Sequence, residues 1–300
     1  MRRKLFNTTN TVKSKTMKYT HGFQPTLSRR IIRRFAKIFV DVFGLNRNSE
    51  FSTEVCQLIR PISTVAFENQ ELKFLSGHGR LKWRADSFFS EEPLMIDWIR
   101  SFDNMDVFLD VGANVGTYTI PAAYRCGKVF AVELDPANIF CLHNNILLNN
   151  LQDNCVILPF AAGSRLSVES VFYRDISLGD ALQSIGREQI LGTIKPNPHV
   201  VNQITFPLDY IFEEFKLPQP SKIKVDVDGN EELVCLGAEN LIKNADELYY
   251  EDNNLKFDVS FKERMLAWGY SVSHEHVTRS TARNLIFTKK HPSNRAYAKS

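Results

Sequence analysis

The sequence predicts an α/β protein with a mostly parallel sheet that is covered by helices on both faces. Short apolar runs, such as residues 107–111 and 128–134, alternate with segments of helical spacing along the middle of the chain. Such continuous apolar runs are typical of parallel strands that are buried on both faces. Three hundred residues, 43% of them apolar, are enough for one large domain with a sizeable core.

The elements are expected in a definite order. Residues 64–76 have the pattern of a hairpin that turns at 68–70, and residues 90–102 that of a helix capped by Ser90, with Pro93 in its first turn. Strands are then predicted at residues 107–111, 128–134, 155–163, 222–228, 247–252, 270–275 and 284–290, with helices at 117–126, 136–150, 230–242 and 260–269. The patternless stretch at 174–204 is expected to be a functional lid.

The chain divides by charge into a basic N-terminal part and a larger acidic part. Residues 1–50 hold twelve Lys and Arg against two acidic residues, although the net charge of the whole chain is only +3. We expect a basic, disordered tail at residues 1–26, a basic amphipathic helix and linker at 27–60, the hairpin and helix at 61–100, the main domain at 101–290 and a C-terminal tail at 291–300.

The basic helix, which runs from Leu27 to Leu45, has apolar residues on one face and arginines on the other. Packing on the following domain and contact with an anionic membrane surface both stay open, whereas nucleic-acid binding is not expected because no aromatic residues for base stacking accompany the charges. No apolar run approaches the roughly 20 residues that span a bilayer, no secretory signal is recognisable, and the five cysteines are scattered. We therefore expect a cytoplasmic protein, with peripheral contact at the inner membrane face as an alternative. The sequence leaves the oligomeric state open.

A glycine-rich turn follows the first predicted strand of the main domain. Asp110 stands at the end of this strand, and the turn GANVG occupies residues 112–116. Ligands of open α/β sheets bind beyond the carboxyl ends of the strands, so we expect a ligand here. A phosphate-binding P-loop would need Gly-Lys-Ser or Gly-Lys-Thr, and a dinucleotide fingerprint would need a central glycine that this turn lacks. Asp110 favours instead a ligand with an ammonium group.

A second carboxylate helps to identify the ligand. Glu133 ends the next predicted strand, about 20 residues after the turn, where a carboxylate accepts the hydroxyls of a ribose. An amine-binding Asp110, a glycine turn and a ribose-binding Glu133 together describe S-adenosylmethionine (SAM). The alternative is that Asp110 and Glu133 only cap the helices that follow them.

Six blocks of sequence occur in the same order as in a known family. They are VFLDVGANVGTYTIPAA, VFAVELDPANIFCLHNNILLNN, PFAAG, FPLDYIF, KIKVDVDGNEELVCLGAENLI and LYYED. With these blocks the chain resembles the FkbM family of SAM-dependent methyltransferases over about residues 64–290. The most specific block contains Asp228, Gly229 and Glu231, which keep the family's order of carboxylate, glycine and glutamate.

The resemblance implies a class I Rossmann-like fold, in which a mostly parallel seven-stranded sheet has one reversed strand, at residues 284–290. It implies SAM as the cofactor and O-methylation of a sugar, glycan or secondary metabolite. The residues that it places around SAM are Asp110, Gly112, Ala113, Asn114 and Gly116 on the methionine side, Glu133 at the ribose, Leu134 and Asp135 beside the adenosine, and Ala161 and Ala162 near the adenine. A common acidic partner of the adenine amino group is missing from PFAAG.

Methyl transfer to a hydroxyl needs aligned reactants and a base. The candidates are Asp226, at the end of a strand beside the expected methyl group, Glu251, at the end of the next strand, and His276, between the last two strands. Asp226 would serve as the base, orient the acceptor hydroxyl or hold the SAM ammonium. No metal is expected, because no complete set of ligands is recognisable. Two other functions stay open: a non-catalytic SAM-fold binding protein and a dinucleotide-dependent oxidoreductase.

Overall fold

A computed structural model of the chain describes residues 27–42, 59–173, 199–252, 259–278 and 282–289, together with residues 50, 54, 175, 177–181 and 183–186. The tails expected at 1–26 and 291–300, most of the linker after residue 42 and part of the expected lid lie outside these residues. The chain forms two compact units, residues 1–44 and residues 45–300, and each is described by itself.

In the first unit the described residues form one helix, α1 (Leu27–Val42). Arg30, Arg33, Arg34 and Lys37 follow one side of it, whereas Ile31, Ile32, Phe35, Ile38 and Phe39 follow the opposite side. The predicted amphipathic helix is therefore present, and it ends at Val42. None of the helices that the structure describes is long and apolar enough to cross a membrane.

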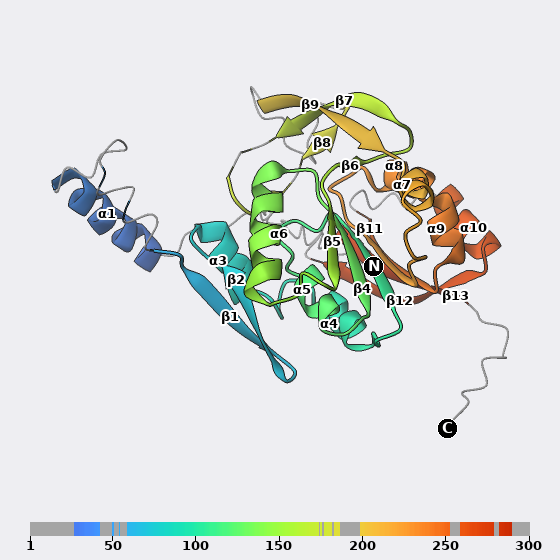
Figure 1. Cartoon of the computed structure of the whole chain (residues 1–300), viewed down its shortest axis with the longest axis horizontal. Coiled ribbons are helices and arrows are strands. Elements are labelled where there is room, and N and C mark those ends of the chain that lie inside the picture. Colours follow the sequence, from blue (N-terminus) through green and yellow to red (C-terminus); the bar gives the residue numbers. More distant parts are fainter. Residues whose placement is uncertain are drawn as a thin grey trace, which may run out of the picture. The chain divides into compact units, whose positions relative to one another are not determined.

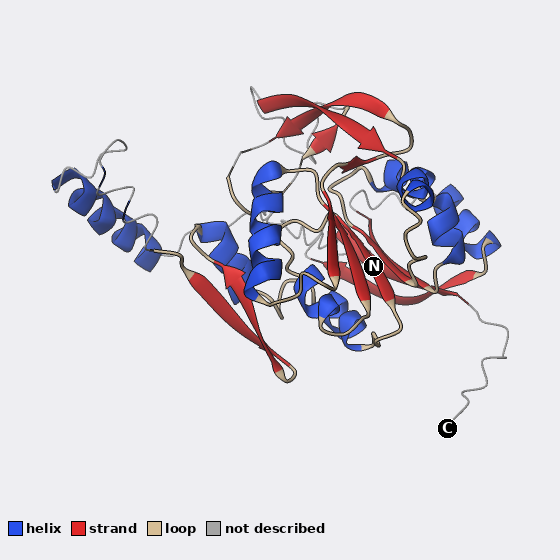
Figure 2. Ribbon diagram, in the orientation of Figure 1, coloured by secondary structure: helices blue, strands red, loops and turns tan. Residues whose placement is uncertain are grey.

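The second unit contains a seven-stranded sheet (Figures 1 and 2). Its strand order is β12-β13-β11-β10-β3-β4-β5. The strands are β3 (Val107–Val111), β4 (Lys128–Val132), β5 (Cys155–Leu158), β10 (Lys222–Val225), β11 (Glu247–Asp252), β12 (Tyr270–Thr278) and β13 (Ala282–Lys289). The pairs from β11 to β5 are parallel, and β13 is antiparallel to both of its neighbours. The predicted fold class and the reversed last strand are confirmed.

Helices cover both faces of this sheet (Figure 2). On one face lie α4 (Pro93–Arg100), α5 (Thr119–Ala123) and α6 (Pro136–Leu148), and on the other lie α7 (Leu208–Glu214), α8 (Glu231–Gly237), α9 (Glu239–Asn244) and α10 (Val259–Ala267). Successive strand residues supply the two cores in turn. In β3, for example, Phe108 packs in the first core and Leu109 in the second, and both are fully buried.

The predicted N-terminal hairpin forms as β1 (Ile62–Phe67) and β2 (Gln70–Leu75), followed by α3 (Gly79–Asp86). Side chains of the central domain accept hydrogen bonds from backbone N–H groups of its second strand. The backbone N–H groups of Lys73 and Leu75 donate to the side-chain carbonyls of Asn149 and Asn145, at 2.9 and 2.8 Å. These bonds occupy part of a strand edge that would otherwise be open to pairing with another chain.

Four expectations about the elements are wrong in detail. The strand expected at 155–163 ends at Leu158, and β6 (Ala161–Ala162) belongs to a separate sheet of order β6-β9-β7-β8. That sheet also contains β7 (Ser167–Tyr173), β8 (Ser184–Ile185) and β9 (His199–Phe206), so part of the expected lid is strand. The helix expected at 230–242 is divided at Ala238 into α8 and α9. The N-cap of α4 is Glu92 and not Ser90.

The contact between α8 and the second sheet leads to a test of the fold. A Cβ atom added at Gly237 would lie 2.0 Å from the carbonyl oxygen of Gly163, so the backbone must shift to admit alanine. We expect Gly237→Ala to destabilise the fold by about 1–3 kcal/mol through overpacking, although alanine is intrinsically better than glycine in a helix. Urea unfolding measures the change. The control is Gly77→Ala, whose nearest neighbour would be Pro61 Cδ at 3.6 Å. Equal stabilities of the two variants would contradict the prediction.

Candidate functional site

The glycine turn after β3 has a conformation that depends on its sequence. Gly112 has φ +83°, and a Cβ atom there would lie 1.8 Å from the backbone oxygen of Asp226. Gly116 has φ +86° and touches Leu142. Asn114, between them, also has positive φ, at +51°. Two glycines and an asparagine are the residues that tolerate this backbone, so the turn brings β3 and β10 into close contact at their carboxyl ends.

Glu133 holds this turn from the end of β4. Its Oε2 accepts the backbone N–H of Asn114 at 2.7 Å, and its Oε1 accepts those of Leu134 and Asp135, both at 2.8 Å. The side chain is buried, and burial raises the pKa of Glu133 to about 7 although these N–H groups bind the anion. Three of roughly four lone-pair positions are thus used within the chain. One position on Oε2 is left for a ribose hydroxyl.

The residues expected at the adenosine have partners in the structure. Asp135 caps α6 by accepting the N–H of Ala137 at 2.8 Å, and it also accepts the side-chain amide of Gln183 at 3.1 Å. Leu134 packs against the core of the second sheet. Ala161 and Ala162 are both buried in β6, away from the end of β5 where they were expected.

A strap formed by residues 177–181 and 183–186 closes over the turn. The side-chain amides of Asn114 and Asn138 donate to the backbone oxygen of Asp180, at 2.8 and 2.9 Å. Arg84 donates to the backbone oxygen of Gly179, and Arg80 forms an ion pair with Asp180. This part of the expected lid therefore lies directly on the glycine turn.

A buried lysine stands at the centre of the site, and sequence reasoning missed it. Lys224 Nζ lies 3.3 Å from Asp110 Oδ1 and 3.1 Å from Asp226 Oδ2, and it donates to the backbone oxygen of Gly112 at 3.2 Å. The side chains of Lys224 and Asp110 are each only 1% exposed. One ammonium thus joins the end of β3, the glycine turn and the end of β10.

The sheet register explains this arrangement. Lys224 of β10 is directly paired with Asp110 of β3, so both side chains leave the sheet on the same face. Burial alone would lower the pKa of Lys224, but the nearby Asp226 and Asp110 carboxylates raise it well above its ordinary value. The signal in the sequence was a lysine inside an apolar strand, at a position where a strand buried on both faces normally has an apolar residue.

Three carboxyl groups at the carboxyl end of the sheet differ in protonation. Burial tends to raise the pKa of Asp226, but the ammonium of Lys224 and a hydrogen bond from Glu251 outweigh it and lower this pKa. Burial and the negative charge of Asp226 raise the pKa of Glu251 well above its ordinary value. Asp226 is therefore an anion at neutral pH, and Glu251 is a neutral acid that donates a hydrogen bond to it.

The third carboxyl group belongs to Glu92, at the N-cap of α4, and was not expected. Burial, followed by the charge of Asp226, raises the pKa of Glu92 to about 7. Its Oε2 accepts the hydroxyl of Tyr249 at 3.1 Å. That tyrosine is fixed by stacking on Trp98, with ring centroids 5.6 Å apart. Glu92 was missed because Ser90 was expected to cap this helix, and because the Glu92 side chain turns away from its own helix, which the sequence does not show.

A row of polar side chains extends from Glu251 across the reversed strand. In the sheet register Asn284 of β13 is paired with Glu251 of β11 on one side and with His276 of β12 on the other. The expectation that His276 lies between the last two strands is wrong, because it lies within β12. Asn284 is 1% exposed, and in the described part of the chain neither of its amide atoms has a hydrogen-bond partner. The Nδ1 atom of His276 is likewise buried and unpaired there.

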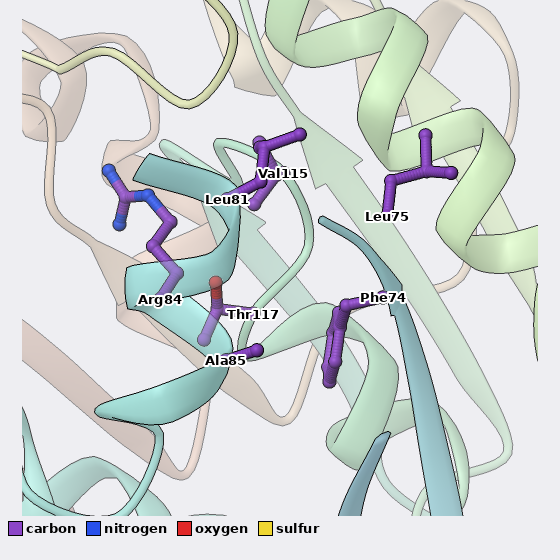
Figure 3. Close-up of a pocket in the computed structure, with 7 residues that line it drawn as sticks. All are labelled: Phe74, Leu75, Leu81, Arg84, Ala85, Val115 and Thr117. Atoms are coloured by element: carbon purple, nitrogen blue, oxygen red, sulfur yellow. The ribbon is translucent and has the colours of Figure 1, made fainter. Parts of the chain in front are cut away.

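A small pocket lies on the hairpin side of the turn (Figure 3). It is lined by Phe74, Leu75, Leu81, Arg84, Ala85, Val115 and Thr117. This lining is apolar except for Arg84 and Thr117, and it contains none of the carboxyl groups. Among the described residues, no three His, Cys, Asp or Glu side chains are placed to hold a metal ion.

The site offers carboxylate oxygens that can accept the ammonium and a ribose hydroxyl of SAM. Asp110 Oδ2 accepts the hydroxyl of Thr119 at 2.6 Å, whereas Oδ1 receives no hydrogen bond although it is buried beside Lys224. An unsatisfied carboxylate oxygen of this kind can accept a ligand ammonium. Asp226 supplies a second carboxylate, and Glu133 supplies one free acceptor position for a ribose hydroxyl.

Comparison with known families identifies the family of the chain. The family model described as "Methyltransferase FkbM domain" matches residues 110–272, which is more than half of the chain. The chain belongs to the FkbM methyltransferase family. SAM is the cofactor of this family, whose members are SAM-dependent methyltransferases. The matched segment contains the glycine turn, Glu133 and Lys224, whereas Glu92 precedes it.

Several solved structures are similar to this FkbM-family chain at low sequence identity, and methyltransferases are among them. The FkbM methyltransferase from Methylobacillus flagellatus KT is 16% identical with a TM-score of 0.45, and the match covers 62% of this chain and 44% of that one. The chain thus spans less than half the length of that protein. A tRNA m1G37 methyltransferase of M. jannaschii is 13% identical with a TM-score of 0.43, and the match covers 77% of this chain and 58% of that one. No curated protein matches the chain.

The buried lysine gives the second prediction. Lys224→Met would leave the buried Asp110 carboxylate and the half-buried Asp226 carboxylate without their cation, so we expect a loss of about 3–5 kcal/mol of folding free energy at about pH 8. The folded-state pKa of Asp226 is lowered, so its ion pair stabilises the wild type above the ordinary carboxyl pKa and is lost as the pH falls. The difference between wild type and variant should therefore shrink towards about pH 4.

Denaturant unfolding at the two pH values measures this difference. The matched control is Lys222→Met on the same strand, because Lys222 pairs with Glu247 at 2.9 Å in a more exposed position. We expect this control to lose about 1 kcal/mol or less. The prediction is contradicted if Lys224→Met is as stable as Lys222→Met at the higher pH.

Proposed function

We propose that this chain transfers a methyl group from SAM to a hydroxyl group of a polyhydroxylated acceptor, such as a sugar or glycan. The observation that carries the proposal is the continuous polar row that runs from Asp226 through Glu251 and Asn284 to His276. It begins beside the glycine turn and ends at the edge of the sheet, so an acceptor bound along it would place one hydroxyl beside the methyl donor.

The unpaired groups of this row suit a ligand with several hydroxyls. A buried amide without partners costs about 1–3 kcal/mol, so such a group is usually explained by a ligand or a functional role. The amide of Asn284 offers a donor and an acceptor side by side, and His276 offers a ring nitrogen. Two neighbouring hydroxyls would satisfy the amide, since each hydroxyl both donates and accepts.

Charge in the site supports SAM as the donor. Two carboxylates, Asp110 and Asp226, surround the single ammonium of Lys224, and Glu92 adds negative charge when it loses its proton. When bound, SAM supplies an electrophilic methyl group on a positively charged sulfur. The chain's own residues hold the ammonium, through Asp110 and Asp226, and align the acceptor along the polar row, which is the larger part of catalysis for an in-line transfer.

Binding and transfer are tested together. Titration calorimetry with SAM, S-adenosylhomocysteine and NAD distinguishes the three functions that the sequence left open. Binding of NAD alone would indicate an oxidoreductase, and binding of SAM without S-adenosylhomocysteine release on any acceptor would indicate a binding protein. Release with hydroxylated sugars, but not with their deoxy analogues, is the result that supports the proposal.

The third prediction concerns Asn284. Asn284→Leu keeps the size of the side chain and removes two unpaired polar atoms, so we expect an equal or higher stability of the fold. The same variant should raise the KM for the acceptor by about tenfold, the scale of one or two lost hydrogen bonds, with unchanged SAM affinity. Steady-state kinetics and thermal unfolding measure the two effects.

Asn145→Leu serves as the matched control for this prediction. Asn145 is also buried, but its amide donates to Val115 and accepts from Leu75, both at 2.8 Å. Its replacement should destabilise the fold by about 1–3 kcal/mol. An Asn284→Leu variant that is as unstable as this control, with unchanged acceptor KM, would show that Asn284 is structural.

We also propose that α1 binds an anionic membrane surface. The helix presents Arg30, Arg33, Arg34 and Lys37 along one side and isoleucines and phenylalanines along the other. This distribution supports a position in the plane of the interface, with the apolar side among the lipids and the basic side at the headgroups.

The fourth prediction tests this membrane contact with the full chain. Co-sedimentation should be strong with phosphatidylserine vesicles, weak with phosphatidylcholine vesicles, and reduced by salt. Arg30→Gln with Arg34→Gln should weaken binding by about 30-fold, since each basic residue near the surface contributes about 1 kcal/mol. Arg165→Gln with Lys262→Gln removes the same charge from the second unit and should bind as the wild type does. Equal binding of the two double variants would contradict a specific role of α1.

A further inference from the structure

We propose that Glu92, at the N-cap of α4, is the catalytic residue that receives the proton of the acceptor hydroxyl during methyl transfer. The proposal rests on the function proposed above and adds to it the identity of the base. Glu92 lies outside the segment that matches the family model, and it is none of the three residues that the sequence suggested for this role.

The first argument is the direction of the Glu92 side chain. An N-cap side chain normally accepts a backbone N–H of its own helix, but the carboxylate of Glu92 makes no such bond. The helix is started instead by Pro93 and by the backbone oxygen of Glu92, which accepts the N–H groups of Met95 and Ile96. The carboxylate is left for the site, where it receives the Tyr249 hydroxyl.

The second argument is access. Glu92 is half-buried: its surroundings desolvate the carboxyl group, while part of the residue still reaches the surface. Its Oε2 accepts the Tyr249 hydroxyl, and among the described residues its Oε1 accepts no hydrogen bond. Tyr249 is in turn fixed by Trp98, so the free oxygen of Glu92 is held in a defined place beside the polar row. A base that is oriented by a second group is the arrangement expected of a proton acceptor.

The third argument is that the other two carboxyl groups are engaged. Asp226 is bound by Lys224 and by Glu251, which makes it a weak base. Glu251 already carries a proton, which it donates to Asp226. Glu92 is left as the group whose pKa, about 7, suits proton transfer near neutral pH.

The charged and titratable groups that face Glu92 come from five elements. They are Glu91 before α4, Lys224 and Asp226 at the end of β10, Tyr249 and Glu251 on β11, Tyr118 before α5, and Arg84 on α3, which acts on Tyr118 and Asp226. Burial and the charge of Asp226 oppose ionisation of Glu92, whereas Lys224 and the Tyr249 hydroxyl favour it. The two tyrosines keep their protons, because burial raises their pKa values well above the ordinary range.

The step balances without a further reagent. The acceptor oxygen forms a bond to the methyl carbon while the bond from that carbon to sulfur breaks, and its electron pair stays on sulfur. The hydroxyl proton passes to the ionised Glu92 carboxylate. Glu92 then returns this proton to water through its exposed side, which restores the carboxylate for the next turnover.

The first experiment needs no acceptor. In protein labelled with ¹³C at glutamate side chains, the Glu92 carboxyl resonance is identified by its absence from Glu92→Gln. We expect it to titrate with a midpoint near 7 in the wild type and higher in Lys224→Met, which removes a neighbouring cation. A midpoint near the ordinary value of 4.5 would overturn the proposal.

The second experiment uses kinetics and SAM binding. Glu92→Gln should lower kcat by about 100-fold or more, with SAM affinity within about threefold of the wild type. Wild-type kcat should rise with pH and level off above about 7, since only the ionised carboxylate accepts a proton. The variant should lack this rise. Asp97→Asn, an exposed carboxylate on the same helix, should match the wild type in all of these measurements.

Each outcome decides between the two proposals. Wild-type turnover and pH profile in folded Glu92→Gln would overturn the role of Glu92 and leave the proposed function standing. A parallel loss of SAM affinity would overturn it too, by showing that Glu92 holds the SAM ammonium. Absence of transfer by the wild type on every hydroxylated acceptor would overturn the proposed function and, with it, the role of Glu92.

Discussion

The structure of the site depends on one buried ammonium. Lys224 lies between Asp110 at the end of β3 and Asp226 at the end of β10, and it also binds the oxygen of Gly112. Without a cation the two carboxylates would repel each other in a place where water cannot screen them. With the cation, two neighbouring strands end side by side, and the close contact between Gly112 and Asp226 becomes possible. The remaining features of the site are built on this edge.

The glycine turn is held a second time, from the opposite side. Glu133 binds the backbone of Asn114, and the strap binds its side chain through the oxygen of Asp180. A carboxylate that sequence patterns associate with ribose is thus also a structural brace, and substitutions there disturb the turn as well as the ligand. The strap holds two elements at once, because the oxygen of Asp180 accepts the side-chain amide of Asn114 in the turn and that of Asn138 on α6. The strap and the glycine turn are therefore joined by hydrogen bonds.

Sequence patterns predicted the central sheet because most of its strands are short, largely apolar runs that alternate with helical segments, and they predicted the glycine turn because few residues tolerate positive φ. They failed where tertiary contacts decide. The break between α8 and α9 lies beside the close packing of Gly237 on Gly163, a contact that no local propensity reveals. Lys224 and Glu92 were missed because their roles arise from a strand register and from a side chain that turns away from its own helix. The position of a residue in the sequence shows neither its partner across a sheet nor the direction of its side chain.

The carboxyl groups of the site hold protons differently because burial acts on each of them and only some are paired with the Lys224 ammonium. Asp226, in contact with Lys224, has a lowered pKa, whereas burial and then the charge of Asp226 raise the pKa values of Glu251 and Glu92. Such a cluster costs stability, since buried like charges oppose each other. The cost is consistent with a ligand that brings positive charge: a sulfonium with an ammonium relieves the repulsion, and loss of the methyl group returns a neutral thioether to a negative site. The same charges that attract the methyl donor therefore also weaken the hold on the product, which lets the site bind one form and release the other.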